Sequence, residues 1–324
     1  MIVTASDMQR FAAASGYQPE ALEKVLHLLA LLAAIRSHPY AGPRVALKGG
    51  TALNLFTLDV PRLSVDIDLN YIGAADRGTM LEERPTLERA LRDVCARVHL
   101  TIHRVPSEFA GGKWRLSYEA SSGNRGTLEL DITFVLRTPL WPAVPVPSRA
   151  FSGAGSVVFP VLDVHELAAG KLAALLARGA SRDLFDAREL LQPGTLDREK
   201  LRVAFVVYGA ANPVDWRTVA AAAVTVTVKD VQEKLLPMLR VDLVPERQHL
   251  TAWTAALVHE CQSLLGAVLP LTENERAFLD GVNDRGEILP DLLTGDERLR
   301  TVIATHPALA WKTVNVRKNK GLSA

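Results

Sequence analysis

Cysteine is scarce in this sequence of 324 residues, which contains only Cys95 and Cys261. The two lie far apart, and neither belongs to a Cys-x-x-Cys pair or to a cluster of histidines. A disulfide framework needs several cysteines, and a zinc site needs clustered cysteines or histidines. The composition therefore argues against both kinds of scaffold and fits a reducing compartment.

Long apolar runs are also missing. The most apolar stretch, Leu28 to Ile35, lies between His27 and Arg36 and is too short to cross a bilayer. The first ten residues contain no basic region followed by an apolar stretch, so we expect no signal peptide. We therefore expect a cytoplasmic protein with no membrane partner.

Net charge is nearly absent, because 37 Lys and Arg residues balance 36 Asp and Glu residues to give +1. This balance excludes a strong basic field over the whole protein. Any binding of nucleic acid would therefore depend on local basic patches.

What the sequence does contain is a glycine pair between a strand and a helix. Residues Arg44 to Leu47 indicate a short buried strand, and Gly49 and Gly50 then let the backbone turn with no side chain in the way of a ligand. Thr51 opens the next apolar-periodic run, so a helix is expected to begin near it. Unpaired N–H groups and the positive end of the helix dipole make this turn a candidate phosphate site.

Two aspartates follow on the next predicted strand. In Val65 to Tyr71 apolar residues alternate with polar ones, which places Asp66 and Asp68 on one face, roughly 7 Å apart along the chain. Two carboxylates this close repel each other unless a cation neutralises them. A pair of Mg²⁺ ions, or Mn²⁺ in their place, would do so.

Each half of this pattern is weak when it stands alone. Gly-Gly-Thr is common, and Asp-x-Asp on an exposed strand is usually only solvated. Together, a phosphate turn and a two-carboxylate platform indicate the active centre of a nucleotidyltransferase.

These residues also carry a resemblance to a known family. The stretch Lys48-Gly49-Gly50-Thr51-Ala52-Leu53, with Arg62-x-Ser64-x-Asp66-Ile67-Asp68-Leu69, resembles the AbiEii/AbiGii family of bacterial nucleotidyltransferase toxins, in the DNA-polymerase-β-like superfamily. The resemblance covers roughly Val45 to Leu191. It implies that Lys48, Gly49, Gly50, Thr51 and Ser64 bind the nucleotide phosphates.

The resemblance also implies a function and partners. The expected enzyme is the toxin of a type IV-like AbiE toxin–antitoxin system, with a role in phage defence. It would transfer a nucleoside monophosphate from an NTP to a hydroxyl, most simply the 3′ end of tRNA, and so block aminoacylation and translation. An AbiEi-like antitoxin, typically a winged-helix protein encoded nearby, would neutralise it.

Polymerase-β-like enzymes need a third carboxylate, and the predicted strand Thr127 to Leu136 supplies two candidates. Its apolar residues alternate with Glu129, Asp131 and Thr133. Asp131 is our candidate for the third metal ligand and for the group that helps deprotonate the attacking hydroxyl, with Glu129 in reserve. The alternative is a solvated strand face.

A second block of the resemblance lies further along the chain. Asp163 and Glu166 form the pattern of a capping box at the start of a helix. If that helix runs through Gly179, its cations fall on one stripe that would bind a triphosphate. The proposed stripe consists of Lys171, Arg178 and Arg182, and we also count Lys171 as a catalytic residue. Asp183 and Asp186 would support these cations. The alternative is a solvated face with ordinary ion pairs.

The predicted fold class is α+β, a polymerase-β-like nucleotidyltransferase domain with a mixed sheet flanked by helices, followed by a mainly α-helical C-terminal domain. We place the domains at residues 1–160 and 161–324, with residues 163–192 completing the active site. The other predicted elements are helices at Pro19 to Ser37 and Thr86 to Val98, strands at Leu100 to Val105 and Trp114 to Ala120, a loop at Pro139 to Ser156, and an edge strand at Val157 to Val161.

Other functions stay open on the sequence. The acceptor could be a Ser, Thr or Tyr hydroxyl of a protein, or the chain could be a non-catalytic regulator that binds a nucleotide. The tail from Lys312 to Lys320, with Trp311 beside it, is either an RNA-contacting patch or a frayed terminus.

Overall fold

The computed structural model describes residues 3–59, 62–106 and 110–321. Contacts within the chain divide it into two compact units. Unit 1 comprises Met1–Arg137, Ala143–Leu162 and Leu236–Val244, and unit 2 comprises Thr138–Pro142, Asp163–Leu235 and Pro245–Ala324. The division into domains at residue 160 stays a prediction.

Unit 1 is built on a mixed seven-stranded sheet with the order β3-β4-β5-β2-β1-β7-β6. The pairs β2–β5 and β1–β7 are parallel, and the other neighbouring pairs are antiparallel. The strands are β1 (Val45–Lys48), β2 (Asp66–Tyr71), β3 (Thr101–Arg104), β4 (Gly111–Glu119), β5 (Arg125–Thr133), β6 (Val144–Pro147) and β7 (Val158–Val161).

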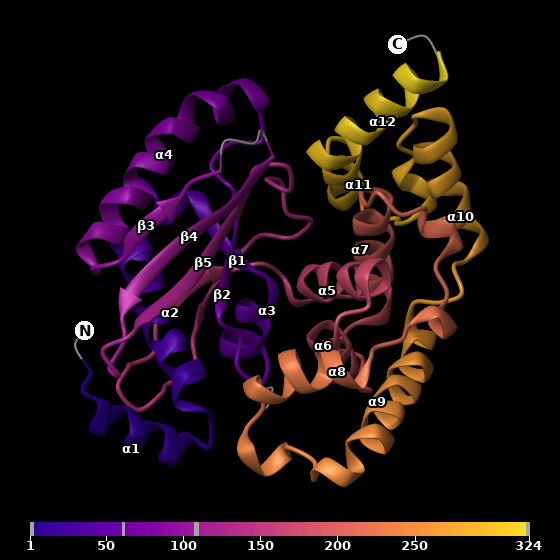
Figure 1. Ribbon diagram of the computed structural model, residues 1–324. Coiled ribbons are helices and arrows are strands. Elements are labelled where there is room, and N and C mark those ends of the chain that lie inside the picture. The colour runs from indigo at the N-terminus through magenta and orange to yellow at the C-terminus, as the bar shows by residue number, and fades with distance from the viewer. Residues whose placement is uncertain (1–2, 60–61, 107–109, 322–324) are drawn as a thin grey trace. The chain divides into compact units, whose positions relative to one another are not determined.

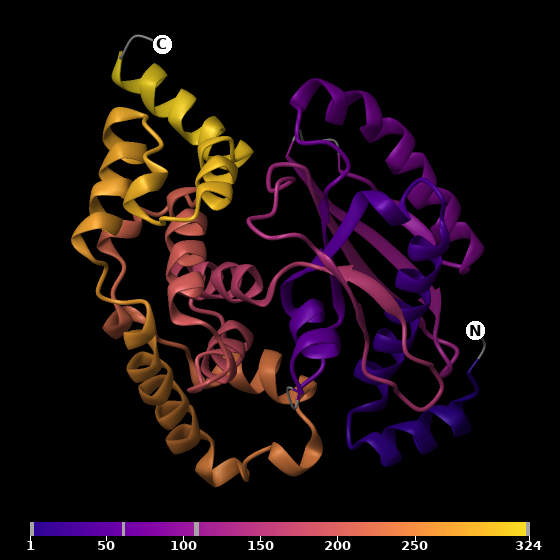
Figure 2. The same cartoon turned by 180° about the vertical axis from the view of Figure 1, so that it is seen from behind.

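Helices α2 and α4 pack against the same face of this sheet, and both views show α4 alongside it (Figures 1 and 2). His27 of α2 stacks on Tyr118 with ring centroids 3.8 Å apart, and Arg92 of α4 lies 5.4 Å from the centroid of the Trp114 ring. The apolar residues of β4 and β5 point to this face and are buried. Their polar neighbours in the strand alternation, including the predicted site residues, therefore lie on the opposite face.

The helices of unit 1 are α1 (Ala5–Ser15), α2 (Pro19–Ser37), α3 (Gly49–Thr51) and α4 (Arg77–Arg97). Those of unit 2 are α5 (Val164–Arg178), α6 (Ser181–Leu190), α7 (Arg198–Ala210), α8 (Val228–Asp230), α9 (Leu250–Leu264), α10 (Glu273–Asp280), α11 (Glu297–Ala304) and α12 (Pro307–Lys320). The α+β class, with a helical C-terminal region, is confirmed. In the part of the chain that the structure describes, no helix has both the length and the apolarity to span a bilayer.

Several elements differ from the predictions, among them α4, β6 and β7. α4 begins at Arg77 rather than at Thr86, because Asp76 caps it by accepting a hydrogen bond from the Thr79 backbone N–H, and the helix continues through Pro85. The predicted proline-rich loop contains strand β6, which pairs with β7. β6 is an edge strand, and prolines are tolerated there because an edge strand has no neighbour on its outer side to accept a hydrogen bond from a backbone N–H. β7 therefore lies inside the sheet and not at its edge, where we had placed it.

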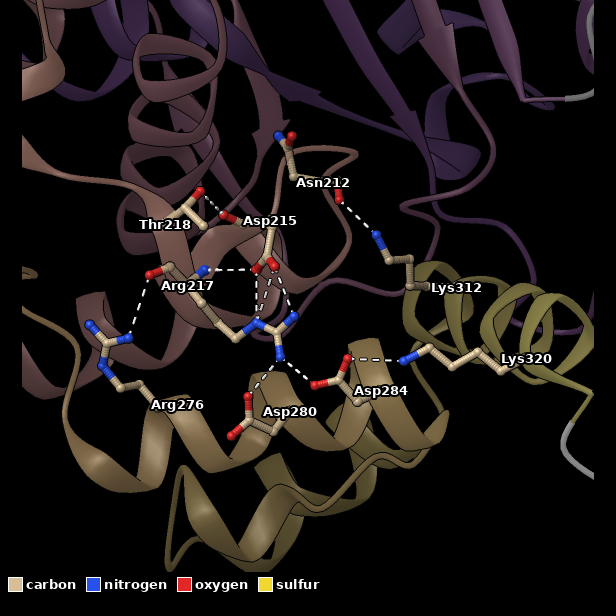
Figure 3. Close-up of polar contacts among 9 residues, drawn as sticks. All are labelled: Asn212, Asp215, Arg217, Thr218, Arg276, Asp280, Asp284, Lys312 and Lys320. Carbon is tan, nitrogen blue, oxygen red and sulfur yellow. Dashed lines mark hydrogen bonds and ion pairs between the residues drawn. The ribbon is translucent and has the colours of Figure 1, made fainter.

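Arg217 holds several helical segments of unit 2 together (Figure 3). Its guanidinium donates to the carboxylates of Asp215 at 2.8 Å and of Asp280 at 2.8 Å, and also to that of Asp284. Lys320, in the last turn of α12, donates to Asp284 at 3.1 Å. These carboxylates hold the pKa of Arg217 above its ordinary value. The network fixes the end of α12 to the rest of the unit.

The predicted frayed terminus is therefore wrong for the residues up to Lys320, which form a helix. Lys312 donates to the backbone carbonyl of Asn212 at 3.0 Å, so this cation too is engaged within the unit (Figure 3). An RNA-binding role for this tail stays a prediction.

The helix cap at Asp163 is as predicted, but the capping box is wrong. Asp163 accepts from the His165 N–H, whereas Glu166 is 1% exposed and accepts from the Trp141 N–H at 3.2 Å and the Tyr208 hydroxyl at 3.1 Å. Burial raises the pKa of Glu166 to about 7.

The buried Glu166 predicts a pH-dependent stability. Its folded-state pKa lies above the ordinary value of 4.5, so the folded protein alone keeps this proton between about pH 4.5 and 7. The contribution of this group to stability therefore falls as pH rises through that window. We expect Glu166→Gln to be more stable than the parent at pH 8 by about 3 kcal/mol, and much closer to it at pH 4.5, in urea unfolding. A difference between parent and variant that does not change with pH would contradict this account.

Candidate active site

The predicted carboxylates lie on two neighbouring strands of unit 1. Strands β2 and β5 run parallel, and their register places Asp68 beside Asp131 and Asp66 beside Glu129. Residues in register on neighbouring strands share a face, and residues two apart on one strand share it too. The register of β2 with β5 therefore puts all four carboxylates on the face that α2 and α4 leave open.

A lysine flanks this row on each side. On β1, Lys48 is in register with Asp68, and on β4, Lys113 is in register with Asp131. Burial raises the pKa of Asp131, and the charge of Asp68 adds to the rise, whereas Lys48 and Lys113 oppose it. Asp131 therefore stands in the field of another carboxylate and takes up a proton more readily than a solvated aspartate.

Glu129, the reserve candidate, is already engaged. The Lys113 ammonium lies 2.7 Å from its Oε2, and this contact raises the pKa of Lys113. Asp131 has no such partner within hydrogen-bonding distance among the contacts of the described residues. Glu129 is therefore the less available of the two carboxylates, and the role of Asp131 as the third ligand stays a prediction.

The glycine pair packs directly against this carboxylate row. Gly49 has a φ of +72°, and a Cβ placed there would lie 2.1 Å from Oδ2 of Asp68. A Cβ on Gly50 would lie 2.7 Å from the hydroxyl oxygen of Ser64. Gly49 therefore requires glycine, and a side chain at Gly50 would displace the Ser64 hydroxyl that lines the turn.

Thr51 connects the turn to the carboxylate strand. Its hydroxyl is buried and donates to the backbone carbonyl of Asp66. A hydroxyl has one hydrogen to donate. The structure therefore shows Thr51 fastening α3 to β2, and its predicted contact with phosphate stays a prediction.

The helix that follows the turn is not regular. It continues from α3 into a π-helical segment, Ala52–Thr57, and the Asn54 side chain donates back to the Gly50 carbonyl at 2.7 Å. π-Helical turns occur often at functional sites. The apolar periodicity of this stretch predicted a helix but did not distinguish its type.

Arg62 is a polar residue of this region to which the sequence analysis gave no role. It is 1% exposed, donates to the Leu63 carbonyl at 2.7 Å, and brings its Nη2 within 3.4 Å of a Cβ placed on Gly50. A buried guanidinium beside the glycine turn adds positive charge where a phosphate is expected. Its place in the motif with Ser64 and Asp66 was the signal that could have identified it.

The oxygen donors of this face suit a hard divalent cation. Among the residues that the structure describes, no three acidic, histidine or cysteine side chains already converge as a metal site. Mg²⁺ is commonly held by one or two carboxylates, with water and substrate phosphates completing its shell. Asp68 and Asp131 are in register with each other, and Asp66 lies two residues before Asp68 on the same face. These three carboxylates fit that kind of binding.

The second predicted group, around Lys171, belongs to unit 2. The Lys171 ammonium is 9% exposed and lies 2.8 Å from Asp183 and 2.9 Å from Asp186, both of them buried. Arg178 also binds Asp183, at 2.7 Å. Burial by itself would raise the pKa of Asp183, but the two cations outweigh it and hold this pKa below its ordinary value.

The predicted three-cation stripe is wrong. α5 ends at Arg178 because Gly179 adopts a φ of +61°, and Arg182 lies on the next helix, α6. Lys171 and Arg178 therefore share α5 without Arg182, and both are partners of buried carboxylates. A role for Lys171 in catalysis stays a prediction.

Comparisons with known proteins bear on this arrangement. The model of a family described as "Nucleotidyl transferase AbiEii toxin, Type IV TA system" matches residues 30–280. The fold is similar to that of MenT4, a nucleotidyltransferase toxin from Mycobacterium tuberculosis H37Rv, with a TM-score of 0.57 over 94% of this chain and 98% of that one. At 18% identity, that likeness concerns the fold alone. A search of the curated proteins gives no match.

Gly49→Ala should damage the site without unfolding the protein. The new methyl group would collide with Asp68, so we expect binding of an NTP with Mg²⁺ to weaken at least about tenfold in calorimetric titration. Gly123→Ala is the matched control, because Gly123 has a φ of +80° with open space around it. Both variants should lose about 1 kcal/mol of stability from the backbone conformation. Equal nucleotide binding by the two would contradict the placement of Asp68.

Lys171→Met should destabilise unit 2. It leaves two buried carboxylates without their shared ammonium, at a cost of about 3–5 kcal/mol in chemical unfolding. Lys229→Met, which removes an exposed lysine, should change stability by less than about 0.5 kcal/mol. Adding Asp183→Asn and Asp186→Asn to the Lys171 variant should recover part of the loss. No recovery would mean that packing, and not buried charge, explains it.

Proposed function

The chain belongs to the AbiEii family and is a nucleotidyltransferase toxin of a type IV toxin–antitoxin system. From this premise we propose that it transfers a nucleoside monophosphate from an NTP to the 3′ hydroxyl of tRNA, and so prevents aminoacylation and arrests translation. The family match extends to residue 280, well beyond the Leu191 limit that the motifs indicated.

One observation carries the proposal. The register of β2 and β5 sets Asp68 beside Asp131, on the face where Gly49 brings a side-chain-free backbone against the Asp68 carboxylate. A phosphate group can approach such a turn closely, and the carboxylates stand next to it. Together with Asp66, these residues are the proposed metal-binding and catalytic groups.

The proposed reaction is an in-line displacement at the α-phosphorus of the NTP. The acceptor hydroxyl oxygen forms a bond to that phosphorus, the bond to the β-phosphate oxygen breaks, and pyrophosphate leaves. Asp131 takes up the hydroxyl proton. Lys48, in register with Asp68, and Arg62, beside Gly50, place positive charge near the phosphates.

Nucleotidyltransferases of this kind generally use divalent metals, and we propose two Mg²⁺ ions held by Asp66, Asp68 and Asp131. Such ions neutralise the carboxylates and the developing charge on the phosphates. A type IV system implies an antitoxin partner, which we propose to be an AbiEi-like protein. We also propose that the enzyme acts in the cytoplasm, where tRNA is charged.

The concrete test is nucleotide transfer to purified tRNA with each labelled NTP in turn. Half of the tRNA is treated with periodate, which destroys the terminal 2′,3′-diol. We expect label on the intact tRNA and none on the oxidised tRNA. Equal labelling of both would place the modification elsewhere on the RNA. Label on protein alone would make the acceptor a Ser, Thr or Tyr hydroxyl, and label nowhere would favour a non-catalytic nucleotide-binding regulator.

Variants of the carboxylates make this test specific. Asp68→Asn should lower transfer roughly a thousandfold, about 4 kcal/mol in transition-state terms, because a neutral amide holds a hard cation poorly. Asp93→Asn, on the exposed face of α4, is the matched control and should retain full activity. Activity of Asp68→Asn within tenfold of the parent would refute the metal-binding role of this face.

A further inference from the structure

The open face of the sheet carries a group of basic side chains beyond the carboxylates. On β4, Lys113 is in register with Asp131 and Arg115 with Glu129. On the edge strand β3, Arg104 is in register with Arg115. We call Arg104, Lys113 and Arg115 the basic edge. Cross-strand partners share a face, so the basic edge lies on the same face as the carboxylates. It is on the β3 and β4 side of them, whereas Lys48 is on the β1 side.

A β-bulge in β3 directs Arg104 to this face. The register of β3 and β4 shifts between Ile102 and Arg104. His103 lies 2.6 Å from the hydroxyl of Ser117, which shares its face with Arg115, two residues away on the strand. Two consecutive residues, His103 and Arg104, therefore reach the open face, although regular alternation would send one of them to the other side. Bulges re-aim side chains in this way, and they are common next to active sites.

The basic edge is a second positive region, separate from the one at the glycine turn. Lys48 and Arg62 lie on the β1 side of the carboxylates. On the other side, Arg115 is one strand away from Asp131, on β4, and Arg104 is two strands away, on β3. Neighbouring strands are about 4.8 Å apart, so these arginines are about 5 and 10 Å out from the strand of Asp131. A phosphate bound there would be adjacent to the reacting groups, on the side away from the glycine turn.

The chemistry of the basic edge favours a polyanion. Arg104 and Arg115 are both exposed, and their register places the two side chains next to each other. A phosphate can contact two neighbouring guanidinium groups at once, because arginine forks match phosphate oxygens in pairs. A protein acceptor offers no regular series of phosphates, whereas the end of an RNA strand does.

We propose that Arg104 and Arg115 bind the backbone phosphates of the last nucleotides of an RNA acceptor and guide its 3′ hydroxyl to the carboxylate row. This inference rests on the proposed function and names the surface that selects RNA. Arg104 and Arg115 act as positioning residues, and Lys113, bound to Glu129, lies between them and the carboxylates.

The test compares the parent with the double variant Arg104→Ala/Arg115→Ala. In steady-state transfer, the KM for tRNA should rise at least about tenfold, while the KM for the NTP stays within about twofold. In tRNA binding without NTP between 50 and 200 mM salt, the slope of log K against log salt should fall by about 0.7 for each lost phosphate contact. Arg104→Lys/Arg115→Lys keeps both charges and should keep the slope.

Arg125→Ala is the matched control. Arg125 is exposed and is in register with Glu119. It lies on the same strand as Asp131, six residues before it, and therefore on the same face of the sheet. It should leave both KM values and the salt slope unchanged. Equal weakening by Arg125→Ala would mean that any surface cation acts alike, which would overturn the basic edge.

The outcomes separate this inference from the proposed function. If the parent labels tRNA and the double alanine variant has the same KM and salt slope, the basic edge is wrong and the tRNA reaction stands. If the parent labels only protein, the tRNA reaction and the basic edge both fail. A raised KM for NTP in the double variant would show that the arginines serve the triphosphate instead, which also overturns the inference.

Discussion

The parallel pairing of β2 with β5 is the constraint on which the candidate active site depends. It brings Asp68 and Asp131, 63 positions apart in the sequence, to neighbouring places on one face. Like charges this close raise the free energy of the folded state unless cations offset them. Lys48 and Lys113, on the strands that flank the pair, provide part of that compensation. The remaining excess of negative charge is what suits this face to a divalent metal.

The glycine turn is fixed to the same strand from the other side. Thr51 donates to the Asp66 carbonyl, which fastens the start of α3 to the carboxylate strand. Gly49 then fits against Asp68 only because it lacks a side chain. The glycine turn is thus held against the carboxylate strand by the Thr51 hydrogen bond and by the close approach of Gly49 to Asp68. Rigid support of this kind is what an active site needs to hold reacting groups in place.

The group around Lys171 shows the opposite use of the same residue types. Asp183 and Asp186 are buried, and their charges are matched by Lys171 and, for Asp183, also by Arg178. Removing one partner of such a group leaves an uncompensated buried charge, so the group makes its helices depend on each other. Acidic and basic residues at regular spacing thus form the candidate site in unit 1 and, in unit 2, an internal ion-pair network where we had predicted a triphosphate-binding stripe. Spacing cannot separate the two cases, because the difference lies in burial.

The sequence by itself determined most of the elements and the family, and it placed the candidate carboxylates on their strands. Strand alternation suffices to place Asp66 and Asp68 on one face, and the glycine pair can be read directly, because both depend on neighbours within a few residues. Tertiary structure decided the rest. Only the register of β2 with β5 placed Asp131 beside Asp68, and only the left-handed conformation of Gly179 separated Arg182 from the helix of Lys171. The bulge that turns Arg104 to the open face likewise depends on the pairing of β3 with β4. These features follow from contacts between segments distant in the sequence, which local patterns do not encode.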